Sequence, residues 1–152
     1  MVEFFSSNLE LAKLTRADLK GANLKGTNLT KADLSHANLR WANLGKANLS
    51  GAHLLGAELS EVDLKHANLN QANLSFANMV ESNISSATMT GANLVGTNLS
   101  WANLNGVDLS RSDLRQAILD LDFKRNPLRV GTAYGGQTAL LSAVRLGIDS
   151  LT

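Results

Sequence analysis

An apolar residue stands at every fifth position of this chain from residue 9 to residue 119. Twenty of these 23 central positions are leucine, and the others are Met79, Ile84 and Met89. The position two before each centre is small, most often alanine, and the position directly before it is Asn or Asp in 18 units. Val2, Glu3 and Phe4 fit the same slots, so the array spans Val2–Leu121 as 24 units without an insertion. So short and regular a period predicts one local conformation repeated along the whole array.

Neither an α-helix nor a flat strand can bury these leucines together. Five residues advance about 500° around a helix, so that successive leucines would be scattered over all its faces. On a strand, successive side chains alternate between faces, and every fifth residue would change sides. The pattern therefore predicts a chain that bends at each unit, with one short side of a coil per unit and the central residue inward. Periodicity alone leaves open how many units close one coil.

The units Ala22-Asn23-Leu24 and Ala32-Asp33-Leu34 are similar to the repeats of the pentapeptide-repeat family, and the resemblance covers Val2–Leu121. It implies an all-β solenoid, a right-handed quadrilateral β-helix with four units per coil. By this resemblance the 24 units form about six coils, and residues 20 apart stack on one another. The side chains of Asn and Asp suit the turns, because they can bond nearby backbone.

We expect two segments, a β-helix over residues 2–121 and a C-terminal capping segment over 122–152. Open solenoid ends need a cover, and Phe4 is expected to plug the first layer. The apolar residues at 140, 141, 144 and 148 have helical spacing, which predicts an α-helical cap over about 137–148. Members of the family that the chain resembles often pair through their C-terminal ends, so the resemblance implies a monomer or a homodimer through the C-terminal end.

Composition narrows the possible partners and compartments. The 14 Lys and Arg nearly balance the 13 Asp and Glu, which argues against binding to nucleic acid or an anionic membrane. The absence of cysteine excludes disulfides and thiolate metal sites. The N-terminal segment MVEFFSSN lacks a basic region followed by a long apolar run, and no apolar run approaches a membrane span. We therefore expect a cytoplasmic protein, and the resemblance suggests cyanobacteria as a common source.

No residue pattern points to catalysis, a cofactor or a bound metal. The four-unit coil separates His36 from His66, and His53 occupies an Asn/Asp slot. Three carboxylates fall near one coil corner, those of Glu58, Glu61 and Asp63. We expect them to be exposed and without a pocket that would raise a carboxyl pKa for acid–base catalysis. Neither a nucleophile elbow nor a phosphate-binding glycine loop is present. We expect a protein that is not an enzyme and binds no cofactor.

Several outward residues suit contact with a protein. In the four-unit coil Trp41 and Trp101 share one slot three coils apart, and Lys20 and Arg40 stack beside Trp41. Exposed tryptophan and arginine are enriched at interaction hot spots. The candidate contact residues are Trp41, Trp101, Lys20, Arg40 and Lys46, and the adjoining face adds Lys25, Lys65 and His66. The alternatives are rings that lie flat on neighbouring coils and scattered solubilising charge.

These observations favour a non-catalytic structural or interaction protein, a rigid rod that presents side chains to an unknown protein partner. The resemblance implies a second hypothesis, a DNA-mimic type protein that binds DNA gyrase and protects topoisomerases. Such mimicry needs a strongly acidic surface, whereas this chain has a net charge of +1 and a basic patch. It also lacks the loop insertions of the quinolone-resistance subgroup.

Overall fold

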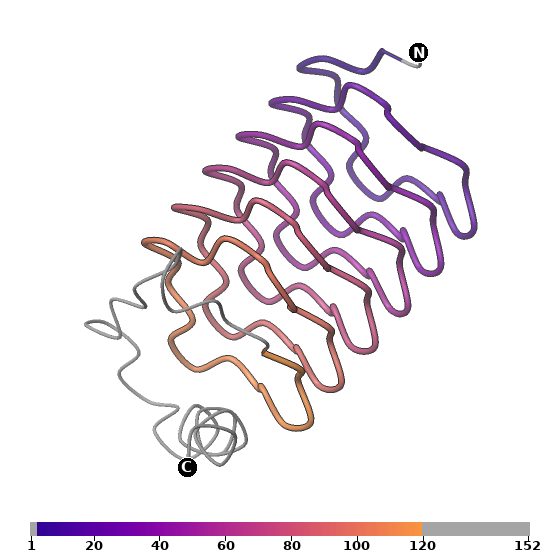
Figure 1. Cartoon of the computed structure of the whole chain (residues 1–152). Helices are drawn as coiled ribbons and strands as arrows, with labels where there is room; N and C mark the ends of the chain where they lie inside the picture. The colour runs from indigo at the N-terminus through magenta and orange to yellow at the C-terminus, as the bar shows by residue number, and fades with distance from the viewer. Residues whose placement is uncertain (1–2, 120–152) are drawn as a thin grey trace, which may run out of the picture.

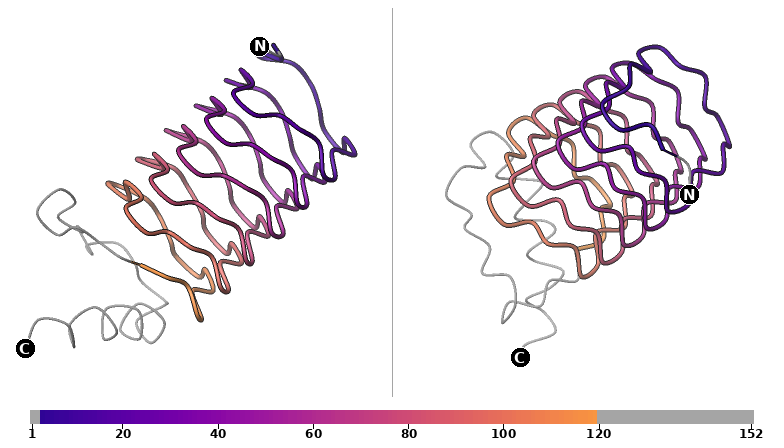
Figure 2. Two further views of the ribbon diagram at one scale, coloured as in Figure 1. Left: turned by 45° about the vertical axis from the view of Figure 1, so that its right-hand side comes forward. Right: turned by 90° about the horizontal axis from the view of Figure 1, so that it is seen from above.

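A computed structural model describes residues 3–119 as a stack of similar coils (Figure 1). Parallel bridges join residues 20 apart throughout, from Glu3 with Asn23 to Asn98 with Ile118. This is the spacing that four five-residue units per coil require. Between residues 3 and 119 each unit contributes one bridge residue, in the Asn/Asp slot, and a two-residue turn, with no longer strand and no helix. The coils follow one axis in every view (Figure 2).

Two of the expectations drawn from the sequence remain predictions. The capping segment 122–152, with its helix over about 137–148, lies outside the described residues. The right-handed sense of the coil also rests on the family resemblance.

The same backbone hydrogen bonds recur in each unit of the inner coils, as the unit around Leu44 illustrates. The amide of Asn43 donates to the Ala22 carbonyl in the coil before, at 2.9 Å. The amides of Leu44 and Lys46 donate to the coil after, at 2.7 and 2.9 Å. A fourth bond, from the amide of Ala47 to the Leu44 carbonyl at 3.0 Å, closes the turn. Each unit is therefore tied to both neighbouring coils, and most backbone polar groups are satisfied without a long strand.

The central and small slots form one continuous buried interior. Every central residue from Leu24 to Leu99 is less than 2% exposed, and the alanines of the small slot from Ala22 to Ala102 are equally covered. Burying a leucine side chain contributes about 1.5–3 kcal/mol, so the ladder of central residues is the main source of stability. Phe4 packs against this interior in the first coil, where it was expected.

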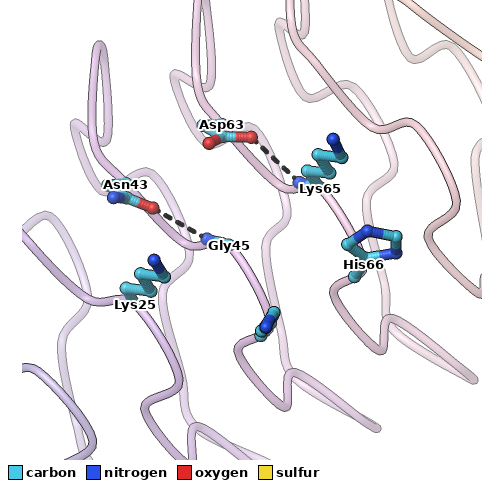
Figure 3. Close-up of a pocket in the computed structure, with 7 residues that line it drawn as sticks. Lys25, Asn43, Gly45, Asp63, Lys65 and His66 are labelled. Carbon is cyan, nitrogen blue, oxygen red and sulfur yellow. Dashed lines mark hydrogen bonds between the residues drawn. The ribbon is translucent and has the colours of Figure 1, made fainter.

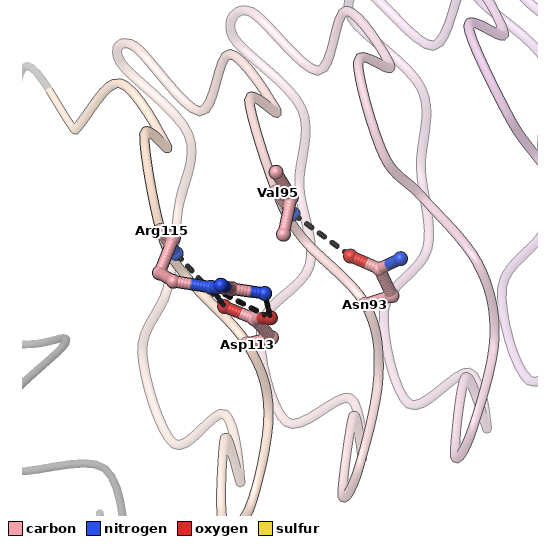
Figure 4. Close-up of polar contacts among 4 residues, drawn as sticks. All are labelled: Asn93, Val95, Asp113 and Arg115. Carbon is pink, nitrogen blue, oxygen red and sulfur yellow. Dashed lines mark hydrogen bonds and ion pairs between the residues drawn. The ribbon is translucent and has the colours of Figure 1, made fainter.

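The Asn and Asp side chains join turns and coils. The Oδ1 atom of Asn48 accepts from the amide of Ser50 two residues later, at 3.1 Å. The same atom accepts from the side-chain amide of Asn68 in the next coil, at 3.1 Å. Figure 4 shows the local bond at Asn93, whose Oδ1 accepts from the amide of Val95. The interpretation that these residues suit the turns is confirmed.

The last slot of each unit has a left-handed backbone. All 23 residues in this slot from Ser6 to Gln116 have φ between 52° and 69°, and sixteen of them are not glycine. Positive φ at the third residue is what a type II turn requires, and non-glycine residues adopt it at a cost. This slot, which the sequence leaves chemically variable, is therefore the most constrained position of the backbone.

Candidate functional site

Trp41 occupies one of these left-handed corners and is half exposed, at 49%. The Lys20 ammonium of the preceding coil lies 4.6 Å from the centre of a Trp41 ring. The guanidinium carbon of Arg40 lies 5.2 Å from a ring centre. Both distances are those of cation–π contacts. The structure thus brings Trp41, Lys20 and Arg40 into one group, which we call the tryptophan corner.

Trp101 lies in the same column but apart from this group. Backbone bonds run from Trp41 to Ser60, from Glu61 to Val80 and from Glu81 to Ser100, which places Trp101 three coils further along. Trp101 is 53% exposed, and within residues 3–119 only Trp41 has a cation over its ring. The two acids Glu61 and Glu81 separate the tryptophans, so they do not form one cluster.

Lys46 lies at the other end of the unit that begins beside Trp41, on the rim of a hollow of about 260 Å³ (Figure 3). We call it the lysine hollow, and its lining comprises Lys25, Asn43, Gly45, Lys46, Asp63, Lys65 and His66. The hollow thus gathers the basic residues that the sequence assigned to one face. We call the tryptophan corner and the lysine hollow together the basic face.

A missing side chain creates the hollow. Lys25, Gly45 and Lys65 occupy the same slot in three successive coils, and the two lysines flank the glycine (Figure 3). Gly45 is buried and has an ordinary φ, unlike the glycines of the last slot. A Cβ at residue 45 would lie 3.2 Å from Asn43 Oδ1 and 3.8 Å from Asp63 Oδ2. Glycine therefore serves here as open space beneath two exposed ammonium groups.

The lysines of the hollow have no ion-pair partners among the described residues. In residues 3–119 the structure has one salt bridge, between Arg115 and Asp113 at 2.6 Å (Figure 4). Asp63 is the single acid of the hollow, and its Oδ1 accepts from the Lys65 amide at 3.0 Å and from Asn83 at 3.2 Å. Three lysines and one aspartate give the hollow a charge of 3 − 1 = +2 with neutral histidine.

The carboxylates with displaced pKa values lie outside the basic face. Hydrogen bonds from the Ser35 hydroxyl and amide and from the Thr15 hydroxyl lower the pKa of Asp33 to about 2. The Ser110 hydroxyl and amide lower the pKa of Asp108, and Arg115 lowers the pKa of Asp113. These groups stay ionised because they accept bonds within turns, which is a structural role.

No metal-binding group of three or more His, Asp or Glu side chains occurs among residues 3–119. The histidines point to different places. His36 lies against Gly56 of the next coil, where a Cβ would come within 2.7 Å of its ring, and His66 lines the hollow. In the same range no helix is long and apolar enough to cross a membrane.

Two features of the site were not predicted from the sequence. The open space at Gly45 was missed, although Gly45 is the one glycine of Val2–Leu121 outside the last slot of a unit. The left-handed corner was missed too, although the other seven glycines of the array fall in that slot. Glycine placement was the available signal in both cases.

Comparisons with known proteins agree with this architecture. The family model "Pentapeptide repeats (8 copies)" matches residues 7–45, 37–75, 57–96 and 82–120. A comparison with curated protein sequences gives no match.

Three solved structures illustrate the range of similarity. HetL, a pentapeptide repeat protein involved in heterocyst differentiation regulation from the cyanobacterium Nostoc sp. strain PCC 7120, is 33% identical with a TM-score of 0.78. The match covers 88% of this chain but only 61% of HetL. A pentapeptide repeat protein from the Arabidopsis thaliana thylakoid lumen is 25% identical, with a TM-score of 0.51 over 81% of this chain and 90% of its own. QnrB1, a plasmid-mediated fluoroquinolone resistance protein, is more distant, at 20% identity and a TM-score of 0.41 over 81% of this chain and 84% of its own.

The family model matches well over half of the chain. The bridges between residues 20 apart, or four units, agree with the coil that the resemblance implied. The chain belongs to the pentapeptide-repeat family.

Proposed function

We propose that this protein is a non-catalytic interaction rod that binds a protein partner through its basic face. The observation that carries the proposal is the half-exposed Trp41 with the cations of Lys20 and Arg40 near its ring. It adjoins a hollow whose lysines have no ion-pair partner among residues 3–119. An aromatic ring flanked by cations resembles the anchors that dominate many protein interfaces.

The exposed part of Trp41 supports a role other than stability. Trp41 is 49% exposed, so part of its ring faces solvent and is available to a partner. Its left-handed backbone, with φ of 60°, is shared by all 23 residues of the last slot and does not distinguish it. Exposed tryptophan is enriched at interaction hot spots.

The relatives support the type of role without fixing the partner. HetL is described as involved in heterocyst differentiation regulation, and a regulatory rod acts by binding other molecules. The present chain spans about three fifths of HetL, so a related regulatory role here is part of the proposal. A cytoplasmic location and a monomer or C-terminal homodimer complete it.

The second candidate is a DNA-mimic type protein that binds DNA gyrase. A mimic of DNA must present a negative surface to a positively charged binding site. Here the lysine hollow has an excess of positive charge, and the net charge of the chain is +1. Charge therefore favours a partner with an acidic surface over gyrase.

Affinity capture from source-cell lysate with matched variants tests the proposal. The variants are Trp41→Ala, Trp101→Ala and Phe76→Ala, the last a control because Phe76 is as exposed, at 63%, on another corner. We expect one protein to be retained by the wild type and by Phe76→Ala and lost with Trp41→Ala. Equal retention by all variants would refute the assignment of the basic face, and capture of gyrase would establish the second candidate.

A further inference from the structure

We propose that the lysine hollow is a binding site for a phosphoryl group. This inference goes beyond the interaction with a protein partner, because the site would recognise a small anion irrespective of the tryptophan corner. It rests on the charge, the donors and the size of the hollow.

The charge of the hollow matches a phosphate better than a carboxylate. Lys25, Lys46 and Lys65 outweigh Asp63 to leave +2, and the described residues supply none of these lysines with an ion-pair partner. A phosphate monoester carries about −1.5 to −2 at neutral pH. A single carboxylate carries −1 and would leave half of the excess charge without a counterion.

The lining combines hydrogen-bond donors from its lysines with acceptor oxygens at its floor. Lys25 and Lys65 come from coils on either side of Gly45 (Figure 3), so their ammonium groups can reach one ligand from two directions. Asn43 Oδ1 accepts from the Gly45 amide at 3.0 Å, and the side-chain amide of Asn43 has no acceptor among the described residues. Lysine ammonium groups and amides are groups that bind phosphoryl oxygens in proteins. Three acceptor oxygens surround the floor, because a Cβ at residue 45 would lie 3.2 Å from Asn43 Oδ1, 3.7 Å from the Lys65 carbonyl and 3.8 Å from Asp63 Oδ2. These acceptors could receive a ligand hydroxyl or a phosphoryl proton.

The size of the hollow limits the ligand. Its volume of about 260 Å³ lies just below the roughly 300–1,000 Å³ of most small-molecule sites. A phosphoryl group with a short organic part or ordered water fits this space, whereas a dinucleotide would exceed it. The glycine at position 45 is what keeps the space open, since the neighbouring coils have lysine in the same slot.

The test is a titration of the full chain with inorganic phosphate, followed by two-dimensional amide NMR. We expect saturable shifts centred on residues 43–46 and 63–66, with one phosphate per chain and at least about tenfold weaker binding of acetate. Because charge-assisted hydrogen bonds are stronger than neutral ones, Lys25→Ala/Lys65→Ala should weaken binding at least about tenfold. Lys31→Ala, an exposed lysine in the last slot on another corner, should leave binding unchanged.

A second variant separates the space from the charge. Gly45→Gln keeps all three lysines and fills the floor, and the same slot holds lysine in both neighbouring coils and serine or asparagine in later ones. We expect this variant to lose phosphate binding while retaining the wild-type thermal transition. Equal affinities for acetate and phosphate, equal losses with Lys31→Ala and Lys25→Ala/Lys65→Ala, or undiminished binding to Gly45→Gln would each overturn the proposal.

A phosphoserine peptide distinguishes two sources of the group. Binding of the peptide at least about tenfold tighter than inorganic phosphate would indicate a phosphorylated protein, and equal affinities a small phosphorylated molecule. Trp41→Ala should bind phosphate like the wild type, so failure of the partner proposal and failure of the phosphate proposal give different results.

Discussion

The interior and the corners of this rod can be compared directly, because each five-residue unit contributes to both. Inside, the central slot holds leucine in almost every unit, with small residues beside it. At the corners, one backbone conformation carries residues as different as Gly21, Trp41 and Glu81. Packing in the interior restricts which side chain can occupy each position, whereas a corner restricts only the backbone conformation. Stability therefore depends on the inward slots, while the outward slots are available for binding.

The largest expected effect comes from placing a charge in the interior. Leu64 is 1% exposed, and Leu64→Lys would bury an ammonium group without a counterion. We expect a loss above about 4 kcal/mol in the free energy of unfolding, measured by urea denaturation. The adjacent exposed Lys65→Ala should change it by less than about 0.5 kcal/mol. Similar tolerance of both substitutions would contradict the inward orientation of the leucines.

A smaller effect is expected where a corner glycine is covered by a neighbour. A Cβ at Gly96 would come within 2.7 Å of the Phe76 ring, whereas a Cβ at Gly21 would meet nothing within 4 Å. Both glycines have positive φ, near 65°. We expect Gly21→Ala to cost about 1 kcal/mol through the backbone alone, and Gly96→Ala to cost more.

The double variant Phe76→Ala/Gly96→Ala is the control for this pair. When the Phe76 ring is absent, Gly96→Ala should lower the free energy of unfolding by the same amount as Gly21→Ala does. The double variant is compared with Phe76→Ala in the same denaturation experiment. If Gly96→Ala lowers the free energy of unfolding equally with and without the Phe76 ring, the ring moves aside without cost and neighbouring corners do not constrain one another.

Two buried hydroxyls of the small slot should respond with opposite signs. Thr97 Oγ1 donates to the Leu74 carbonyl at 2.7 Å, and Thr97→Val should lose about 1 kcal/mol of stability. Ser82 Oγ is buried and has no hydrogen-bond partner within residues 3–119, so Ser82→Ala should be neutral or stabilise by up to about 1 kcal/mol. Calorimetric melting of both variants tests this. A clear destabilisation by Ser82→Ala would mean that its hydroxyl is satisfied in solution.

The smallest effect is the contribution that a carboxylate of the Asn/Asp slot makes to stability at low pH. The pKa of Asp33 lies at about 2, below its ordinary value of 3.8. The ionised Asp33 therefore stabilises the folded protein above pH 3.8, and this stabilisation is lost as the pH falls through 2. Asp33→Asn should flatten the stability profile between pH 4 and pH 2. Ser35→Ala should move the NMR titration midpoint of Asp33 towards 3.8, and an unchanged midpoint would contradict the role of the serine.

The sequence predicted the interior better than the surface, for a physical reason. Burial requires the same kind of residue in every coil, so the leucine period and the Asn/Asp slot reveal the inward column and the turn. No such repetition governs the outward side chains, whose rotamers depend on their individual neighbours. The grouping of Trp41 with Lys20 and Arg40 followed from stacking alone, whereas the open space at Gly45 depends on an absent side chain.

The parallel bridges between residues 20 apart have a consequence for how such a rod can change length. Inserting or deleting a single unit would preserve the leucine period and the buried interior. Every later side chain would nevertheless shift by a quarter turn about the axis, and Trp101 would leave the column of Trp41. Only gains or losses of four units keep the outer surface in phase. The fold thus tolerates length changes in steps of five residues, but its pattern of surface residues tolerates them only in steps of twenty.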